Sequence, residues 1–366
     1  MNYASLTSSN MGSVFKQQIE KKIHAEMDPK GVVKRSEAKA YDGELSTEEA
    51  MDVIDQLASA KVPVILFSGG EPLIRPDIMH LADRAIRHGI RVTFSTNGTL
   101  ITSEKAKQLK QLGVSYVGIS LDGIGAIHDR FRRKEGAFEA ALRGIRNCLA
   151  EGQKVGLRFT MNKHNIDSLP EILRLMEEEN IPRACFYHLV YAGRGAVEDD
   201  ITLEQSREAV DLIVDAIQRF AANGSAREIL TVDNHADGIY LYLKMQEEQP
   251  ELAERIYQKL LRNGGNRSGI AICNIDHKGF IHPDQFSQHI ALGNLREQSF
   301  ADIWGGSHPV LDGLRNRKEL ITGRCAKCQY FEACNGNFRP RAFGYDGSYW
   351  SSDPQCYLTD EEIGIV

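Results

Sequence analysis

From about Glu44 to Arg194 the chain alternates short apolar runs, rich in β-branched residues, with longer stretches of amphipathic helical pattern. Continuous apolar runs are typical of strands buried on both faces, and helices between such strands allow them to lie parallel. The pattern predicts five strands, near residues 62–67, 91–96, 116–121, 154–161 and 184–191. We therefore expect an α/β fold with a partial (β/α) barrel. A Rossmann domain is the competing architecture, and no Gly-x-Gly-x-x-Gly motif follows the first strand.

Helix signals and a change of character along the chain divide it into segments. Capping boxes at Ser46–Glu49 and Ser168–Glu171 predict the starts of two helices between the strands. Residues 196–266 carry Glu, Gln, Ala and Leu at helical spacing, whereas short strands, turns and clustered cysteines follow. The predicted organisation is an atypical N-terminal segment at 1–40, a partial barrel at 41–195, a helical connector at 196–266 and a second domain at 267–366.

Composition narrows the class of protein. The chain has 366 residues, 42% of them hydrophobic and 26% charged, with a net charge of −6. Its basic residues are scattered, which argues against a nucleic-acid or membrane-surface binder. No apolar run is long enough to span a membrane, and residues 1–30 lack the apolar core of a signal peptide. We therefore expect a cytoplasmic protein whose seven cysteines are thiols or metal ligands rather than disulfides.

Polar residues follow four consecutive predicted strands. The segments are FSGGEP at 67–72, STNG at 95–98, GISLDG at 118–123 and LRFTMN at 157–162. Paired glycines allow a ligand to approach closely, Glu71 offers a carboxylate to an amino group, and Arg158 can clamp a carboxylate. Ser120 and Asp122 can bind hydroxyls. Each alone is equally explained by a turn or a surface ion pair, but together they predict one ligand site where barrels place their active sites.

Four cysteines near the C-terminus form the second informative pattern. Cys325-x2-Cys328-x5-Cys334 is followed by Cys356. Four thiolates can hold an iron–sulfur cluster or a tetrahedral zinc ion. Zinc sites more often show two Cys-x2-Cys pairs, so the asymmetric spacing favours a cluster. Cys273 is either a further ligand, a substrate-facing thiol or a plain buried residue, and Cys148 and Cys185 are expected in the core.

The order of these motifs resembles that of radical S-adenosylmethionine (SAM) enzymes. The resemblance implies a (β/α)6-type barrel in which Gly69, Gly70 and Glu71 hold the methionyl amino group, Ser120 the ribose and Arg158 the methionyl carboxylate. Asn97 and Asp122 belong to the same expected SAM site. The C-terminal cysteines resemble an auxiliary [4Fe–4S] motif of the SPASM domains attached to such barrels. A further cysteine of that motif is replaced by Phe338, so a complete second auxiliary cluster is not expected.

Other segments resemble a narrower group, the radical SAM proteins of haem d1 and alternative haem biosynthesis. They are residues 187–195, 279–286, 292–296 and 353–362. The resemblance implies a siroheme-derived tetrapyrrole, didecarboxysiroheme, whose acetate or propionate side chains are removed by a 5′-deoxyadenosyl radical. It also implies an electron donor such as ferredoxin or flavodoxin. By the same resemblance, contacts to the macrocycle are expected from His188, Arg194, His282 and Gln285, although a single histidine is more often a satisfied core residue.

The chain departs from this family in one respect. A radical SAM enzyme binds its first [4Fe–4S] cluster through Cys-x3-Cys-x2-Cys, yet no cysteine precedes Cys148. Residues 27–30 and 36–45 resemble the two flanks of that loop, and only Gly31–Arg35 lies between them. The cluster expected from the family therefore has no ligands in this segment. The alternatives are an altered gene product, a cluster-less paralogue that binds tetrapyrrole or SAM, and a peptide-modifying SPASM maturase.

Overall fold

The computed structural model describes residues 43–193, 195–225 and 227–365. The predicted N-terminal segment at 1–40 and Arg194 lie outside these residues. The chain divides into two compact units. The first contains the described residues up to 158 together with 269–311, and the second contains 159–268 together with 312–365.

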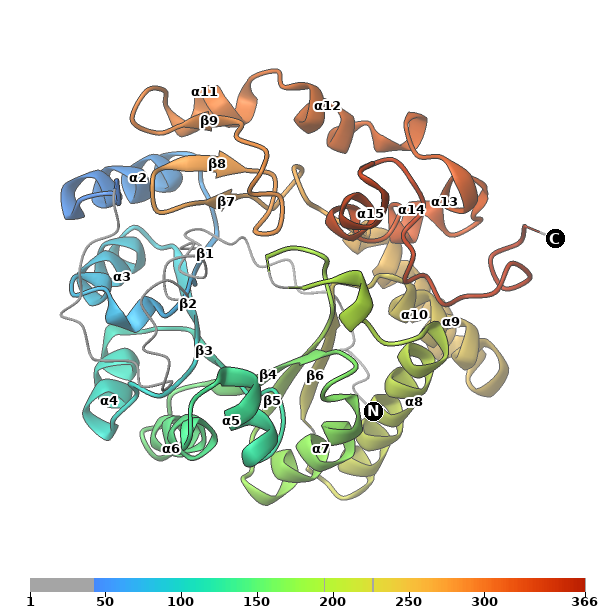
Figure 1. The fold of residues 1–366 in the computed structure, drawn as a ribbon, viewed down its shortest axis with the longest axis horizontal. Coiled ribbons are helices and arrows are strands. Elements are labelled where there is room, and N and C mark those ends of the chain that lie inside the picture. The colour runs from blue at the N-terminus through green and yellow to red at the C-terminus, as the bar shows by residue number, and fades with distance from the viewer. Residues whose placement is uncertain (1–42, 194, 226, 366) are drawn as a thin grey trace. The chain divides into compact units, whose positions relative to one another are not determined.

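The main sheet has six strands in the order β1-β2-β3-β4-β5-β6. The recorded strand pairs are parallel, with Val64 opposite Arg91 and Val117 opposite Val155. The strands are β1 (Val64–Phe67), β2 (Arg91–Thr96), β3 (Tyr116–Ser120), β4 (Val155–Met161), β5 (Arg183–His188) and β6 (Glu228–Val232). The predicted partial barrel and its five strands are therefore confirmed (Figure 1).

The sixth strand is a finding that the sequence pattern did not reveal. β6 lies within residues 196–266, for which helices alone were expected, and it pairs with β5. It is five residues long and begins at Glu228, a few residues after a long helix that ends at Ala222. Such a short apolar run, set between long helical patterns, cannot be distinguished from a helix by its periodicity.

Alternation along the strands gives the sheet of the first unit two different faces. The apolar face is formed by fully buried side chains, those of Ile65, Val92, Phe94, Val117 and Ile119. Two helices, α3 (Ile78–Arg87) and α6 (Ala137–Ala150), contact this part of the sheet. Figure 1 shows them, with α4 (Ser103–Leu112), on one side of these strands. Side chains of successive residues point to opposite faces, so the partly exposed strand-end residues point to the other face.

One of the two predicted capping boxes is confirmed. Before α2 (Thr47–Ser59), Ser46 Oγ accepts a hydrogen bond from Glu49 N at 3.1 Å, and Ser46 N donates to Glu49 Oε2 at 2.7 Å. At Ser168 the predicted helix start is confirmed, because a helix begins at Leu169, but the capping-box hydrogen bonds are absent. A 3₁₀ turn, Ile166–Ser168, runs directly into α7 (Leu169–Glu178), and Ser168 is helical with φ −83° and ψ −7°. A residue in that conformation does not present its hydroxyl to the first turn.

A small antiparallel sheet completes the first unit. Its strands are β7 (Asn274–Ile275), β8 (Phe280–His282) and β9 (Gly293–Asn294), followed by α11 (Phe300–Gly305). Arg296 joins this sheet to α2, because its Nε and Nη2 atoms donate to Glu49 at 2.6 and 2.9 Å. The predicted change to short strands and turns is therefore seen here.

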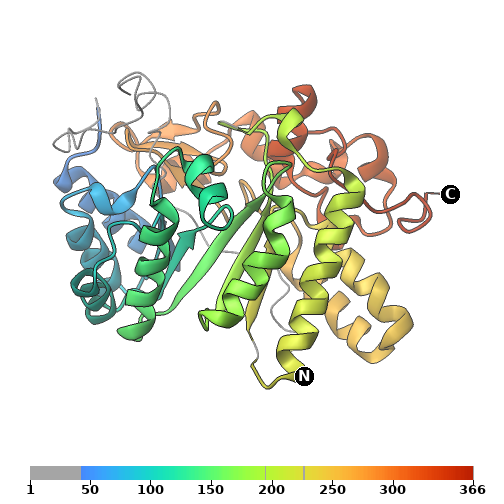
Figure 2. The same cartoon turned by 60° about the horizontal axis from the view of Figure 1, so that its bottom comes forward.

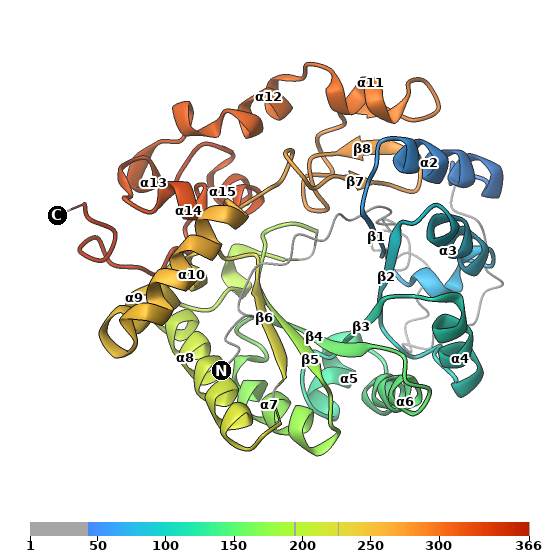
Figure 3. The same ribbon diagram turned by 180° about the vertical axis from the view of Figure 1, so that it is seen from behind.

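The second unit is built on long helices and a run of short ones. Figure 2 shows α7 and α8 (Leu203–Ala222) beside strands β5 and β6, and Figure 3 shows α9 (Ala236–Glu248) next to α10 (Pro250–Asn263). The short helices α13 (Gly323–Lys327), α14 (Phe331–Cys334) and α15 (Arg339–Asp346) also belong to this unit. By contrast, α5 (Ala126–Arg132) belongs to the first unit, and the division between the units falls within α12 (Pro309–Arg315). A cluster of buried apolar side chains joins α9 and α10 to the C-terminal segment, including Tyr240, Met245, Leu260, Tyr330 and Tyr357. None of the described helices is long and apolar enough to cross a membrane.

Candidate functional site

The glycine-rich loop after β1 is shaped by its glycines and by Glu71. Gly69 has φ +142°, a conformation that glycine adopts readily and other residues do not. Gly70 is exposed, and Glu71 begins the 3₁₀ turn Pro72–Ile74. The backbone of the two glycines is thus accessible to a ligand while the next residue is anchored.

Glu71 is buried and holds this loop against the end of β2. Its Oε1 accepts from Thr96 Oγ1 at 2.6 Å and from Leu73 N at 3.1 Å, and its Oε2 accepts from Asn97 N at 2.7 Å. Burial raises the pKa of Glu71, although the hydrogen bonds from Thr96, Asn97 and Leu73 oppose that shift. A carboxylate has about four acceptor sites, so one remains on Oε2 for the expected amino group. Sequence reasoning assigned no role to Thr96, although it stands inside the STNG motif.

Asn97 shapes a turn rather than presenting its side chain outward. Its Oδ1 accepts from Thr99 N at 2.8 Å and from Thr99 Oγ1 at 2.7 Å, which closes an Asx turn. Gly98 follows with φ +75°, and a Cβ added there would lie 2.6 Å from Ile119 Cγ2. The glycine is therefore required for the end of β2 to approach β3.

Ser120 and Arg158 lie side by side at the ends of β3 and β4. They are direct partners in the parallel register, as are Gly118 and Gly156. A Cβ added at Gly118 would lie 2.7 Å from Arg158 Cδ, so the stem of Arg158 runs over this glycine. Both Ser120 and Arg158 are partly exposed. The structure thus brings together the two residues predicted for the ribose and the methionyl carboxylate.

Asp122, also predicted for the SAM site, is engaged with protein groups. Its side chain is only 5% exposed and accepts from Arg132 Nε at 2.5 Å. The Asp122 backbone N donates to His128 Nδ1 at 2.9 Å, which places the proton of a neutral His128 ring on Nε2. Burial lowers the pKa of His128 and so favours that neutral ring. Arg132 and His128 were not singled out from the sequence, because nothing in the spacing marks them.

The four C-terminal cysteines surround one cavity in the second unit. Cys325 lies in α13, Cys328 directly after it, Cys334 ends α14, and Cys356 lies in the C-terminal segment. All four are free thiols. The cavity between them is completed by apolar and aromatic side chains, including Ile239, Tyr330, Phe331 and Leu358. Among the described residues, no three His, Cys, Asp or Glu side chains are arranged to hold a single metal ion.

The electrostatics of this cavity reflect four crowded thiols. Burial raises the pKa of Cys328, and it raises the pKa of Cys356 to about 11. Burial, with Cys356, Cys325 and Cys328 nearby, raises the pKa of Cys334 well above its usual range. Such thiols stay protonated in a metal-free protein, and binding of iron would displace their protons. Four soft ligands that line one largely apolar cavity fit an iron–sulfur cluster, whose irons bind separate thiolates.

The remaining cysteines are not among the residues that line this cavity. Cys148 and Cys185 are both 0% exposed, as expected for core residues. Cys273 is partly exposed, and burial raises its pKa to about 12. Phe338, which stands where the SPASM motif has a further cysteine, is 6% exposed and precedes α15.

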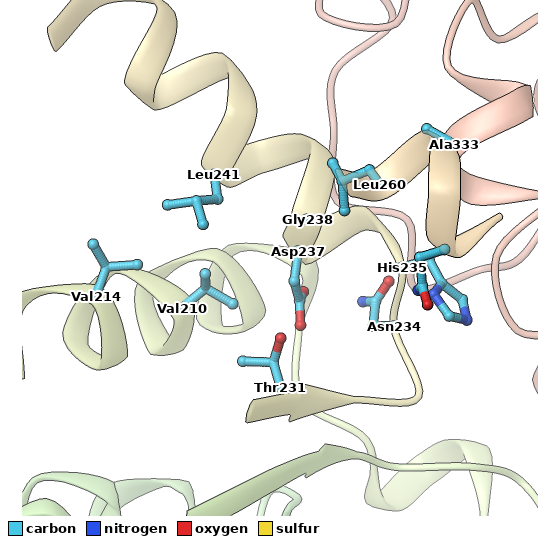
Figure 4. Close-up of a pocket in the computed structure, with 11 residues that line it drawn as sticks. Val210, Val214, Thr231, Asn234, His235, Asp237, Gly238, Leu241, Leu260 and Ala333 are labelled. Atoms are coloured by element: carbon cyan, nitrogen blue, oxygen red, sulfur yellow. The ribbon is translucent and has the colours of Figure 1, made fainter. Parts of the chain in front are cut away.

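His188 is held in a buried network of the second unit. Its Nε2 lies 3.0 Å from Asp237 Oδ2, and Asp237 Oδ1 accepts from Tyr357 OH at 2.8 Å. Burial alone would raise the pKa of Asp237. The neighbouring His188 and the hydrogen bonds from Thr231 and Tyr357 outweigh burial and lower that pKa. Figure 4 shows Asp237 above Thr231, at a cavity that Asn234 also lines. The geometry is that of a satisfied core histidine, so His188 is poorly placed to give its ring to a substrate.

Of the other expected macrocycle contacts, His282 and Gln285 are described by the structure and Arg194 is not. His282 is 3% exposed, with Nδ1 2.6 Å from the carbonyl oxygen of Ile290 and Nε2 3.5 Å from Asp276 Oδ2. Gln285 is partly exposed, and its carbonyl accepts from Gln288 Nε2 at 3.2 Å. Arg194 is one of the residues that the structure does not describe.

Comparison with known proteins identifies the family. The family model of the radical SAM superfamily matches residues 29–176, and that of the SPASM iron–sulfur cluster-binding domain matches residues 268–329. The chain is 54% identical to Fe-coproporphyrin III synthase of Methanosarcina barkeri, over 88% of this chain and 83% of that protein. It is 39% identical to pre-heme d1 synthase of Dinoroseobacter shibae, over 89% and 82% of the two chains.

A solved structure shows the same fold at low identity. The structure titled native anSMEcpe with bound AdoMet superposes with a TM-score of 0.69 at 16% identity, covering 97% of this chain and 96% of that one. The cofactors of the family are SAM and iron–sulfur clusters. The chain belongs to the radical SAM superfamily, in the SPASM-domain family of haem-biosynthesis enzymes that includes Fe-coproporphyrin III synthase and pre-heme d1 synthase.

Proposed function

We propose that this chain acts on a siroheme-derived tetrapyrrole, didecarboxysiroheme, in a reaction that removes acetate or propionate side chains. The observation that carries the proposal is the 54% identity to Fe-coproporphyrin III synthase over 83% of that protein. The substrate class follows from that relative and from pre-heme d1 synthase, whose names both denote haem-type products. An electron donor such as ferredoxin or flavodoxin completes the expected system.

The proposed SAM site uses the strand ends of the first unit. The backbone of Gly69 and Gly70 and the free acceptor position on Glu71 receive the methionyl amino group. Arg158 pairs with the methionyl carboxylate, and Ser120 hydrogen-bonds the ribose. Asn97 and Asp122 contribute by fixing the loops through Thr99 and Arg132. A radical cluster beside this site would supply the chemistry for hydrogen abstraction from the substrate, but residues 31–35 offer no thiolate to hold one.

The proposed auxiliary [4Fe–4S] site uses the four C-terminal cysteines, Cys325, Cys328, Cys334 and Cys356. Their common cavity and their asymmetric spacing support this assignment. A cluster held there would accept or donate the electron that the proposed side-chain fragmentation requires. His282 and Gln285 remain candidates for the carboxylates of the macrocycle, and Cys273 for an extra ligand or a substrate-facing thiol.

A second candidate function is binding of tetrapyrrole or SAM without radical chemistry. It is favoured by one observation, the absence of any cysteine before Cys148. The segment where the family carries its radical-cluster loop has Lys34 and Arg35 instead, and neither is a soft ligand for iron.

Anaerobic iron and sulfide analysis of the reconstituted protein, with and without Cys328→Ala, separates the two. Loss of about four irons on that change, leaving none, supports one C-terminal cluster and the binding role. About eight irons, of which four survive, favours the catalytic role. Deoxyadenosine release with didecarboxysiroheme under reducing conditions then tests catalysis, and mass analysis of the tetrapyrrole tests side-chain loss. Binding of neither SAM nor the tetrapyrrole would refute both functions.

A further inference from the structure

Two arginines of the C-terminal segment are completely buried, and their charges are balanced differently. Arg339 and Arg341 are both 0% exposed. Arg341 forms a bidentate ion pair with Asp353, with Nε–Oδ1 and Nη2–Oδ2 distances of 2.8 Å. Arg339 instead donates to backbone carbonyls, those of Tyr349 at 2.9 Å, Ser351 at 2.6 Å and Gly336. Within the described part of the chain, no carboxylate lies at ion-pair distance from it.

A buried cation without a counter-ion is costly. Carbonyl dipoles satisfy its N–H groups but carry no net charge, so they replace only part of the hydration that burial removes. Arginine does not relieve this cost by losing its proton, since its guanidinium remains protonated in proteins. A fully buried arginine is therefore expected to lie next to a group of negative charge.

The surroundings of Arg339 point to the cysteine cavity. Arg339 Nη2 donates to the carbonyl oxygen of Gly336, a residue that lines the same cavity as Cys325 and Cys334. Gly336 lines the cavity, and a Cβ built on it would lie 3.5 Å from Arg339 Nε. That Nε is a buried donor with no hydrogen-bond partner among the residues that the structure describes.

We infer that Arg339 is the counter-ion of the C-terminal iron–sulfur cluster and that its charge raises the cluster's reduction potential. The inference rests on the proposed function, because it takes the four cysteines as the cluster's ligands. A cluster held by four thiolates is negatively charged, and it becomes more negative when it gains an electron. A fixed positive charge in a low-dielectric setting therefore stabilises the reduced form more than the oxidised form.

The redox step is a one-electron transfer. The external donor, dithionite in the test or ferredoxin in the proposed system, is oxidised by one electron, and the cluster is reduced by one electron. Arg339 keeps its proton throughout and forms no covalent bond. It is a positioning residue, which acts on the reaction only through the cluster.

The test compares the reduction potentials of Arg339→Gln, Arg339→Lys and the unmodified protein, each reconstituted anaerobically and titrated with electron paramagnetic resonance (EPR) detection. Arg339→Gln removes the charge and is expected to lower the ratio of reduced to oxidised cluster about tenfold at a fixed potential, a shift of ~59 mV. Arg339→Lys keeps the charge and should remain close to the unmodified protein. Iron content, measured on every sample, confirms that the same cluster is compared.

Arg324→Gln is the matched control. Arg324 also lines the cavity, but it is paired with Asp360 at 2.5 Å and its side chain is 29% exposed. Solvent and the carboxylate already screen its charge, so this variant should shift the potential much less than Arg339→Gln. Equal shifts in the two variants would overturn the special role of Arg339.

The outcomes separate this inference from the proposed ligands. A full iron content with an unchanged potential in Arg339→Gln overturns the role of Arg339 and leaves the cysteine ligands standing. Absence of any cluster from the unmodified protein overturns the ligand assignment and the inference with it. If Arg339→Gln fails to hold iron, pulsed EPR of the unmodified protein with ¹⁵N-guanidinium arginine decides. A ¹⁵N coupling to the reduced cluster that survives in Arg324→Gln supports the inference, and its absence overturns it.

Discussion

Replacement of Gly118 by alanine is expected to weaken SAM binding without touching SAM. The added Cβ would lie 2.7 Å from Arg158 Cδ and 3.2 Å from Arg158 Cγ, closer than carbon atoms pack. The strand backbone is fixed by its parallel pairing with β2 and β4. The flexible stem of Arg158 must therefore move, and with it the guanidinium proposed to bind the methionyl carboxylate.

The size of the effect follows from what Arg158 loses. A hydrogen bond to a charged group contributes about 1.5–3 kcal/mol, which corresponds to roughly a tenfold to hundredfold change in the dissociation constant. Because Arg158 can keep one of two bonds after a small shift, we expect Gly118→Ala to weaken SAM binding about tenfold. Calorimetric titration with SAM measures this. Stability should not fall by a similar amount, since alanine loses less backbone entropy than glycine on folding.

A double-mutant cycle with Arg158→Ala tests the proposed cause. Truncation of Arg158 removes the nearest atom that the new Cβ would meet and leaves Tyr116 Cε1 at 3.2 Å, so Gly118→Ala should have a much smaller further effect in that background. Additive losses in the two variants would refute the reasoning, because they would mean that Gly118 acts through something other than Arg158. An unchanged SAM affinity in Gly118→Ala alone would also refute it.

Three further predictions concern the loop anchor, the cysteine cavity and pH. Glu71→Gln turns an amide N–H toward the backbone N–H of Leu73 or Asn97, so one hydrogen bond is lost. Urea titration should therefore show a free energy of unfolding lower by ~1–3 kcal/mol. An unchanged value would contradict the hydrogen-bond assignment. Gly265→Ala should reduce reconstituted iron, because its Cβ would lie 2.0 Å from the Cys334 carbonyl oxygen at φ +60°, whereas Gly264→Ala, at φ +68° and 3.4 Å from Arg267 Nη1, should retain iron. Burial lowers the pKa of His235 to about 4 from 6.5. The unfolded chain therefore binds more protons between those values, and stability should be lost as the pH falls from 6.5 to about 4, by no more than ~3 kcal/mol. His235→Gln should remove that part of the pH dependence, and a parallel pH profile in the two proteins would disprove it.

Sequence reasoning succeeded where a feature is encoded locally. The five strands and the Ser46 capping box depend on residues a few positions apart, and the structure confirms them. At Ser168 the helix start was predicted correctly but the capping box does not form, because a preceding 3₁₀ turn changed the backbone of that residue. Sequence reasoning missed β6 because five residues between helices give no clear period, and only pairing with β5 makes them a strand.

The candidate site divides in the same way. The strand-end motifs placed Ser120 and Arg158 near one another, and the structure brings them into register. The partners that decide what a polar side chain can do come from elsewhere in the chain. Asp237, 49 positions away in the sequence, lies with its Oδ2 atom 3.0 Å from Nε2 of His188 and so engages that ring nitrogen. No spacing rule reports such a pairing, because it depends on how the elements pack.

The anchoring of Glu71 bears directly on the missing cysteine loop. Its carboxylate is fixed by Leu73 of the following 3₁₀ turn and by Thr96 and Asn97 at the end of β2. The glycine-rich loop therefore derives its shape from the barrel and does not need a cluster to hold it. The same is true of Arg158, whose stem is positioned by Gly118. The contacts proposed for the methionyl and ribose groups of SAM therefore rest on residues of the barrel. Titration with SAM tests those contacts, whereas deoxyadenosine release tests the radical cluster, so the two measurements answer separate questions.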